Sequence, residues 1–277
     1  MGCRMCHANV IDAIAESIVK DRRNFLAASL GLGAFSVMTA QPATAAAPRT
    51  FSSIVDLTHQ LHEDIPTYFG SKQFFSEKKF SLKADGLNLN EWRFSEHVGT
   101  HIDAPLHFSE DGQDVSELPL ASLYVPLVII DVREGASRSP DYQVSPGDIQ
   151  EHIKRHGPLP KGCCVAMQSG WSKLIDSPKF RGETSSGLHF PGFHPDAIEL
   201  LLKESEAFGI AVDTLSLDFG QSKTFETHKN WLPTGRWGVE CLNLVDSIPV
   251  RGAYLFVGCP KVRQGTGGPS RVVAFLP

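Results

Sequence analysis

Residues 95–108 read S-E-H-V-G-T-H-I-D-A-P-L-H-F, and this stretch decides how the rest of the chain must be arranged. Its glycine, its β-branched residues and its proline all disfavour a helix, so we expect an extended backbone. Side chains alternate along a strand, which would place His97, His101 and Asp103 on one face. Gly99 would leave an empty slot between the two imidazoles. The pattern therefore predicts a slot for a metal ion.

Two neutral imidazoles and a carboxylate form a ligand set that suits Zn, Mn or Fe. Three protein ligands leave coordination positions open for water and substrate, which favours catalysis over a purely structural metal. The alternative is that these are ordinary surface or core side chains. Burying so many ionisable groups beside Val98, Ile102 and Leu106 would be costly without a partner, so we favour the metal.

The run H-x-G-T-H-x-D-x-P-x-H-F at 97–108 resembles the signature of the cyclase-like metal hydrolases, a family that includes bacterial kynurenine formamidase and isatin hydrolase. Every position of that signature is present in this chain. The resemblance implies that His97, His101 and Asp103 are metal ligands. It also implies that His107 is the catalytic acid/base.

The same resemblance implies a second half of the site. His228 and Glu240 lie twelve positions apart, as do a late histidine and a glutamate in kynurenine formamidase. By resemblance both are metal ligands, and Asp103 bridges two ions. Some relatives hold one ion only, so the expected cofactor is one or two divalent ions, zinc or manganese. Without the resemblance, Glu240 would pass for an ordinary surface charge.

Four residues are candidates for contact with a substrate. Residues 66–70 (P-T-Y-F-G) match the loop P-x-W-P-G of kynurenine formamidase, with Tyr68 in place of tryptophan, which implies a different substrate shape. Phe69 and Trp231 would extend an aromatic wall for a planar substrate, or would belong to the core. His189 lies in a loop rich in aromatic and turn residues, from which it could reach the pocket.

The composition points to an ordinary globular domain with a small-molecule substrate. The chain has 277 residues, of which 42% are hydrophobic and 21% are charged, and its net charge is −5. Lysine and arginine are scattered, so the sequence offers no basic stripe for nucleic acid. A small-molecule substrate is favoured by elimination.

Residues 1–47 are predicted to be an export signal. Residues 21–26 (D-R-R-N-F-L) carry a twin arginine, and an apolar run and an alanine-rich segment follow. We expect twin-arginine export, cleavage after Ala45, and a periplasmic or secreted protein. The apolar run of 16 residues is too short and too mild for a membrane span. An uncleaved anchor and an amphipathic helix are the alternatives.

The domain at 52–277 is expected to have a mixed α/β fold with few helices. Helices are predicted at 145–156 and 196–206, each with capping residues at its start. Residues 80–94 should lead as a strand into the histidine motif, with a turn near Gly86, and further strands are predicted at 54–57, 125–132, 162–168, 210–218, 253–257 and 272–276. The resemblance sharpens this to the swivelling β/β/α cyclase-like fold, in a homo-oligomer, dimer or tetramer.

The expected reaction is hydrolysis of an amide-type C–N bond, in an aryl formamide or in a cyclic amide such as an isatin-like substrate. The metal would lower the pKa of a bound water, and His107 would take the water's proton and return it to the leaving nitrogen. One alternative is a lyase or cyclase of the dehydratase type with the same ligands. Another is a periplasmic metal-binding protein without catalysis, against which the open coordination counts.

Overall fold

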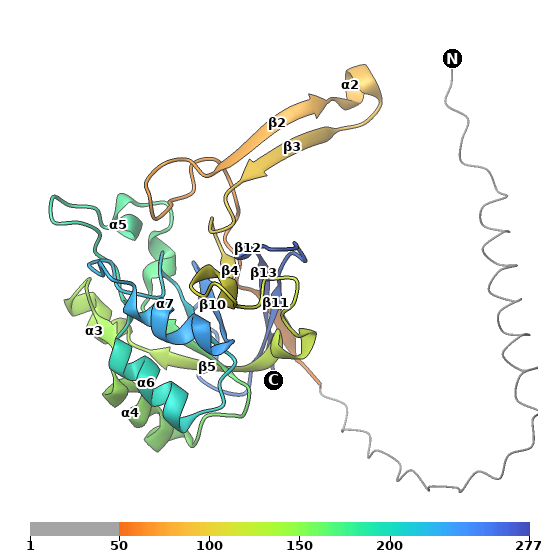
Figure 1. Cartoon of the computed structure of the whole chain (residues 1–277). Coiled ribbons are helices and arrows are strands. Elements are labelled where there is room, and N and C mark those ends of the chain that lie inside the picture. The colour runs from red at the N-terminus through yellow and green to blue at the C-terminus, as the bar shows by residue number, and fades with distance from the viewer. Residues whose placement is uncertain (1–49) are drawn as a thin grey trace, which may run out of the picture. The chain divides into compact units, whose positions relative to one another are not determined.

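The computed structural model describes residues 50–277, in which a nine-stranded mixed sheet forms the centre (Figure 1). The neighbouring pairs β5–β7, β7–β9 and β9–β10 are parallel, and the other pairs are antiparallel. In spatial order the strands are β1 (Ser53–Asp56), β13 (Arg271–Leu276), β11 (Tyr254–Gly258), β5 (Tyr124–Asp131), β7 (Cys164–Gln168), β9 (Gly209–Val212), β10 (Trp237–Glu240), β4 (His101–Asp103) and β12 (Gly267–Pro269). The prediction of a mixed α/β fold with few helices is confirmed.

Helices cover one face of the central strands. Along β5, Leu127 and Ile129 belong to one hydrophobic cluster, whereas Val128 and Ile130 belong to another. A strand that is buried on both faces reads as a continuous apolar run, as this one does. The second cluster includes residues of α4 (Pro146–His156), α6 (Pro195–Glu204) and α7 (Glu226–Trp231).

The remaining elements are short. They are α2 (Leu82–Asp85), α3 (Arg133–Arg138), α5 (Pro178–Arg181), and the two-stranded sheets β2 (Phe74–Phe80) with β3 (Leu89–Phe94) and β6 (Gln143–Val144) with β8 (Gly192–Phe193). Single 3₁₀ turns cover Pro105–His107, Leu120–Ser122, Trp171–Leu174 and Leu232–Thr234. Of these elements, the turn Pro105–His107 contributes His107 to the cavity described below.

The two predicted helices are confirmed, and their first residues show why the sequence signal was strong. Ser145 accepts a hydrogen bond from the backbone N–H of Asp148, whose side chain accepts one from the Ser145 backbone. This reciprocal capping satisfies backbone donors that the first turn leaves unpaired. At α6, the His194 ring accepts a hydrogen bond from the Asp196 backbone N–H.

Two predicted strands are shorter than expected. The prediction of extended backbone through the histidine motif is wrong at the start of the motif. β4 covers only His101–Asp103, and Gly99 has a φ of +63° that turns the chain. The strand predicted at 210–218 ends at Val212. Beyond that point, the Asp213 carboxylate accepts hydrogen bonds from the backbone N–H groups of Ser169 and Trp171. The chain there closes a loop instead of extending the sheet.

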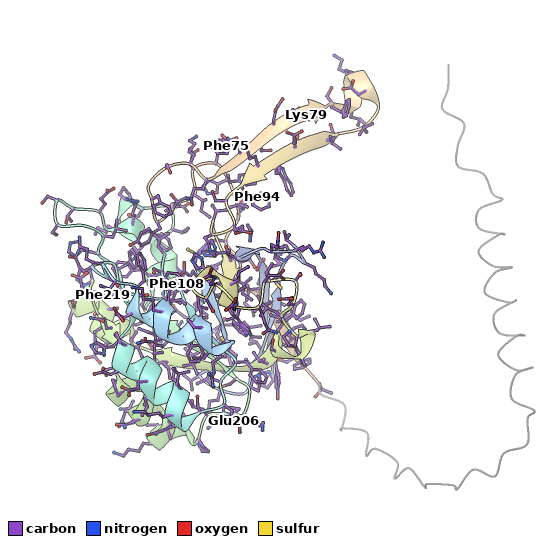
Figure 2. The ribbon with its side chains drawn as sticks, in the orientation of Figure 1. Phe75, Lys79, Phe94, Phe108, Glu206 and Phe219 are labelled. Carbon is purple, nitrogen blue, oxygen red and sulfur yellow. The ribbon has the colours of Figure 1, made fainter. Side chains whose placement is uncertain are left out.

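Residues 74–94 form a hairpin, not the single strand expected at 80–94. β2 and β3 pair along their length and project from the central sheet, with α2 at the tip (Figure 1). The expected turn at Gly86 is confirmed, since its φ of +79° ends α2. Figure 2 shows Phe75, Lys79 and Phe94 along this arm. Every residue of the two strands beyond Phe74 is exposed or partly exposed.

The export signal predicted for residues 1–47 lies outside the residues that the structure describes. Within residues 50–277, no helix combines the length and the hydrophobicity that crossing a bilayer requires.

Gly209 of β9 packs so closely against Trp237 of β10 that it leaves no room for a side chain. A Cβ at Gly209 would lie 2.2 Å from the buried ring of Trp237, so Gly209→Ala should lower the free energy of unfolding by about 1–3 kcal/mol. At Gly147, in α4, the nearest atom to a Cβ is 3.5 Å away, so Gly147→Ala should be neutral or stabilise by up to about 1 kcal/mol. Urea unfolding of both variants checks this, and equal losses would contradict the packing described here.

Candidate metal centre

Two strands, a helix and a loop bring the candidate ligands together. β4 supplies His101 and Asp103, which lie two residues apart and therefore on the same side of the strand. β10 pairs with β4 so that Glu240 lies directly opposite His101. His228 comes from α7, and His97 comes from the loop that precedes β4. The fold thus gathers the five side chains that the sequence singled out as ligands.

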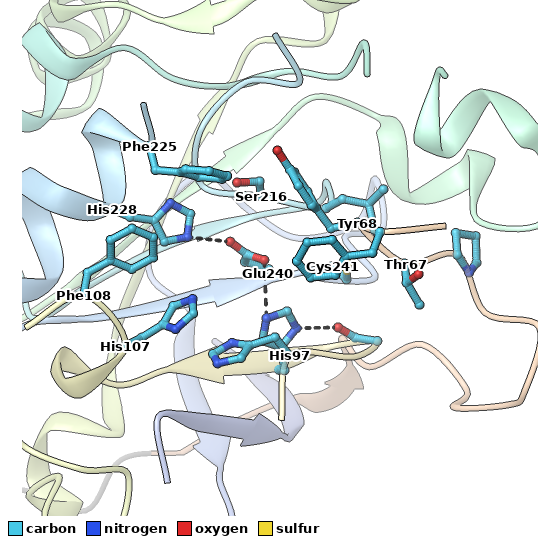
Figure 3. A pocket seen from close by; sticks show the side chains of 15 residues that line it. Thr67, Tyr68, His97, His107, Phe108, Ser216, Phe225, His228, Glu240 and Cys241 are labelled. Carbon is cyan, nitrogen blue, oxygen red and sulfur yellow. Dashed lines mark hydrogen bonds and ion pairs between the residues drawn. The ribbon is translucent and has the colours of Figure 1, made fainter. Parts of the chain in front are cut away.

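Asp103 is the residue that three histidines share. Its Oδ1 lies 2.7 Å from His97 Nδ1 and 3.3 Å from His101 Nε2, and its Oδ2 lies 3.6 Å from His228 Nε2. Glu240 contacts two of the same rings, at 3.3 Å from His101 Nε2 and 3.0 Å from His228 Nε2. Figure 3 shows His228 and Glu240 facing one another at the pocket. The side chains therefore converge.

The spacing and burial of these atoms fit a metal ion. Ligand atoms about 2.1 Å from one ion, at angles from 90° to tetrahedral, are roughly 3.0–3.4 Å apart. The distances of 3.0 and 3.3 Å from Glu240 to His228 and His101, and of 3.3 Å from His101 to Asp103, lie in this range. His101 Nε2 and Asp103 Oδ2 are buried and have no hydrogen-bond partner within residues 50–277. Burying unpaired polar atoms, together with the two carboxylates of Asp103 and Glu240, is costly unless a cation compensates them.

Two overlapping ligand sets are present. His101, Asp103 and Glu240 offer atoms within 4.8 Å of one another, and so do His97, Asp103 and His107. Asp103 belongs to both sets, which suits a carboxylate between two ions. The donor set is thus compatible with one ion or with two, and it includes His107 as a candidate ligand besides its predicted role in proton transfer.

The carboxylates stabilise positive charge at this place. Burial by itself lowers the pKa of His101, but the Asp103 and Glu240 carboxylates raise that pKa to about 10. Burial opposes the charged form of His228 as well, yet the neighbouring Asp103, Asp218 and Glu240 carboxylates hold its pKa well above the usual value. For Asp103, burial raises the pKa, but the three neighbouring histidines hold it well below its ordinary range. The same field favours a metal cation.

Outer partners orient two of the rings. His101 Nδ1 lies 2.8 Å from the Gly99 carbonyl, to which it donates, so its Nε2 faces the cluster. His228 Nδ1 lies 2.6 Å from Asp218 Oδ2, which leaves its Nε2 facing Glu240. Such second partners fix the tautomer of a metal-binding histidine. Sequence reasoning missed Asp218, which it read only as the end of a strand.

His107 lies beside the cluster and reaches the pocket. Its ring stacks on the His97 ring, with centroids 3.8 Å apart. Burial lowers the pKa of His107 to about 4, so the imidazole is neutral at neutral pH. Within the described part of the chain, the His107 ring makes no hydrogen bond. Its nitrogens are therefore available to a ligand in the pocket.

A cavity of about 320 Å³ adjoins the cluster, and its walls are largely apolar. Sequence reasoning did not name Phe108, Leu215 or Phe225 among its lining residues, although Phe108 belongs to the histidine motif. Phe225 and Cys241, which also line the cavity, both have positive φ values, of 54° and 53°. Such strained backbone is found most often at functional sites.

The predicted substrate residues divide into two pairs. Tyr68 and Phe69 line the cavity, and Phe69 is 73% exposed at its rim. Trp231 does not, because α7 turns it into the core, where it is 0% exposed and donates a hydrogen bond to the Trp237 carbonyl. His189 is not among the lining residues either, since Asp141 holds its ring at 2.8 Å. The predictions for Trp231 and His189 are therefore corrected.

Comparison with known proteins supports the same chemistry. The family model described as "Putative cyclase" matches residues 55–219. An isatin hydrolase of Roseibium aggregatum is 32% identical over 192 residues, which cover 66% of this chain and 72% of that one. A kynurenine formamidase of Bacillus cereus is 37% identical over 228 residues, which cover 80% of this chain and 97% of that one.

A solved structure is similar over most of the domain. Isatin hydrolase A from Labrenzia aggregata, bound to benzyl benzoate, superimposes with a TM-score of 0.77 at 32% identity. The superposition covers 81% of this chain and 93% of that one. The expectation of a cyclase-like fold is confirmed.

The shared position of Asp103 predicts that its charge is indispensable to metal binding. Asp103→Asn keeps the size of the side chain but removes the carboxylate, so divalent-metal affinity should fall more than about 100-fold, beyond the loss typical of an outer partner. His189→Ala, outside the cavity, should bind metal as the unmodified protein does. Calorimetric titration of the metal-free proteins measures both, and full affinity in Asp103→Asn would refute the assignment.

Proposed function

This chain belongs to the cyclase family, and from that membership and the geometry of its site we propose that it is a metal-dependent hydrolase that cleaves an amide-type C–N bond. The observation that carries the proposal is the buried Asp103, which three histidines contact beside an open apolar cavity. A purely structural metal would be enclosed by protein, whereas this cluster adjoins space for a substrate.

We propose His97, His101, Asp103, His228 and Glu240 as the residues that hold the metal. Imidazole and carboxylate ligands suit zinc or manganese, and Asp103 suits either one ion or two. When bound, a divalent metal supplies a water of lowered pKa and polarises a carbonyl group.

We propose that His107 transfers the proton and that aromatic side chains orient the substrate. His107 faces the cavity with no hydrogen bond of its own, so it can accept a proton from water and return it to the leaving nitrogen. Its stacking on His97 keeps the ring within reach of the cluster. The rings of Phe108, Phe225 and Tyr68 also line the cavity and make much of its wall apolar (Figure 3).

An aromatic amide is the substrate class that this cavity supports best. Phe225 lies between Tyr68 and Phe108, with ring centroids 5.8 and 6.0 Å away, and together they offer faces to a planar group. The similar proteins are named for isatin and for kynurenine, which both carry an aromatic ring. We therefore propose an aryl formamide or a cyclic amide of the isatin type.

His107→Ala separates proton transfer from metal binding. We expect the variant to keep its metal content but to lose about 10²–10⁴-fold in kcat, the usual contribution of a general acid/base. Isatin and formylkynurenine, tested side by side, serve as substrates, and metal analysis of protein purified without chelators serves as the control. Unchanged turnover would refute the role, and loss of metal would make His107 a ligand instead.

We also propose a homo-oligomer, dimer or tetramer, in which the β2–β3 hairpin forms a contact. A two-stranded hairpin is marginally stable alone, and this one exposes an unusual number of large apolar side chains. They are Phe80, Leu82, Leu87, Leu89, Trp92 and Phe94. Its charges are nearly balanced, with Lys78, Lys79, Lys83 and Arg93 against Glu77, Asp85 and Glu91, so two copies of the arm can approach without net repulsion.

The hairpin proposal predicts which exposed residues control assembly. Leu82 and Trp92 are 63% and 64% exposed, and the double change to serine should weaken association by about 30-fold or more. Leu120→Ser, at a 72% exposed site in another part of the chain, should leave assembly unchanged. Light scattering across a dilution series measures the mass. A monomeric unmodified protein, or an unaffected double variant, would contradict the proposal.

A further inference from the structure

The loop ahead of β12 approaches His97 from the side opposite Asp103. Thr266 Oγ1 lies 2.8 Å from His97 Nε2, while His97 Nδ1 lies 2.7 Å from Asp103 Oδ1. Thr266 Oγ1 also lies 2.5 Å from Glu96 Oε2. Glu96, Thr266 and His97 thus form a continuous chain of hydrogen bonds that ends at the candidate metal centre.

The Glu96 carboxylate decides which atom donates in each of these hydrogen bonds. An ionised Glu96 carboxylate can only accept hydrogen bonds, and a threonine hydroxyl has one proton to donate. The Thr266 proton therefore goes to Glu96, and Thr266 Oγ1 must accept its second hydrogen bond from His97 Nε2–H. His97 consequently carries a proton on Nε2.

The other ring nitrogen of His97 is then the one that meets the metal. In neutral imidazole, a proton on Nε2 leaves a lone pair on Nδ1, and here that lone pair faces a carboxylate oxygen of Asp103 at 2.7 Å. This is hydrogen-bond distance, and a metal ion held by both atoms would take the place of a proton between them. His101 and His228 are held in the reverse sense, because their Nδ1 atoms contact Gly99 and Asp218 and their Nε2 atoms face inward.

The loop places Thr266 rigidly. The Thr266 carbonyl accepts a hydrogen bond of 2.9 Å from the Ala104 backbone N–H, and its own N–H faces Glu96. A Cβ at Gly267 would lie 2.2 Å from the Ile102 carbonyl oxygen and 2.8 Å from His97 Cε1. Only glycine permits so close an approach, so the hydroxyl is brought to the imidazole by backbone contacts and not by a mobile side chain.

We propose that Glu96 and Thr266 are positioning residues that hold His97 with its proton on Nε2, so that His97 binds the metal through Nδ1 whereas His101 and His228 bind through Nε2. This inference rests on the proposed function, since it concerns the same metal centre. It assigns a role to Thr266, in the loop ahead of β12.

Two variants of Thr266 test the hydroxyl. Thr266→Val keeps the shape and removes the acceptor, so the metal-free protein should bind zinc about 10-fold or more weakly in calorimetric titration. Thr266→Ser keeps the hydroxyl and should stay within about twofold of the unmodified protein. Thermal unfolding of the metal-free proteins, with midpoints within a few degrees, shows that the fold is intact. Unchanged zinc affinity in Thr266→Val would overturn the inference.

Nitrogen NMR of the zinc-loaded protein reads the tautomer directly and does not depend on turnover. We expect His97 to show a protonated Nε2 and a zinc-bound Nδ1, and His101 and His228 to show the opposite pattern, with each ring assigned from a single His→Gln variant. Zinc on His97 Nε2 would overturn the inference but leave the proposed function intact. An unmodified protein that binds no divalent metal would overturn both.

Discussion

The antiparallel pairing of β4 with β10 is the constraint on which the rest of this structure depends. It sets Glu240 opposite His101 and, two residues along β4, brings in Asp103. The result is a pair of carboxylates buried among imidazoles, an arrangement that a folded chain tolerates only when positive charge compensates it. The rest of the sheet holds these two strands in place. β9 and β7 continue it beyond β10, and helices cover their outer face, so the strands that hold the carboxylates have little freedom to separate.

The chemistry of the site follows from a contrast between two kinds of group that lie side by side. The charged groups favour a cation, and the aromatic rings packed against them favour an apolar, planar molecule. His107 stands at the boundary, stacked on a proposed ligand yet facing the cavity. A group in that place can exchange a proton with a substrate while its ring stays fixed. The strained backbone at Phe225 and Cys241 indicates that the surrounding packing holds the walls in position.

Local patterns in the sequence predicted the buried strands, the helix starts and the histidine motif, because each of these depends on residues that are close along the chain. What the sequence could not predict depends on distant partners. Nothing near Gly99 reveals that the backbone turns there against Leu61 and Ile65. Trp231 was misplaced because an aromatic residue beside a site can face either the cavity or the core, and only the orientation of α7 decides. Asp218 and Thr266 were missed because only the fold brings them beside a histidine.

The long sequence separation between the histidine motif and Thr266 affects the order in which the site is completed during synthesis. His97 and Thr266 stand 169 positions apart, yet they touch in the finished fold. At synthesis rates of 5–20 residues per second, the ribosome delivers the first of them roughly 10–30 s before the second. For most of that interval the nascent motif has neither of its neighbouring strands, because β10 and β12 both come late in the chain. Glu240 and Thr266 thus join the histidine motif only near the end of synthesis, and we expect tight capture of an ion to be a correspondingly late event.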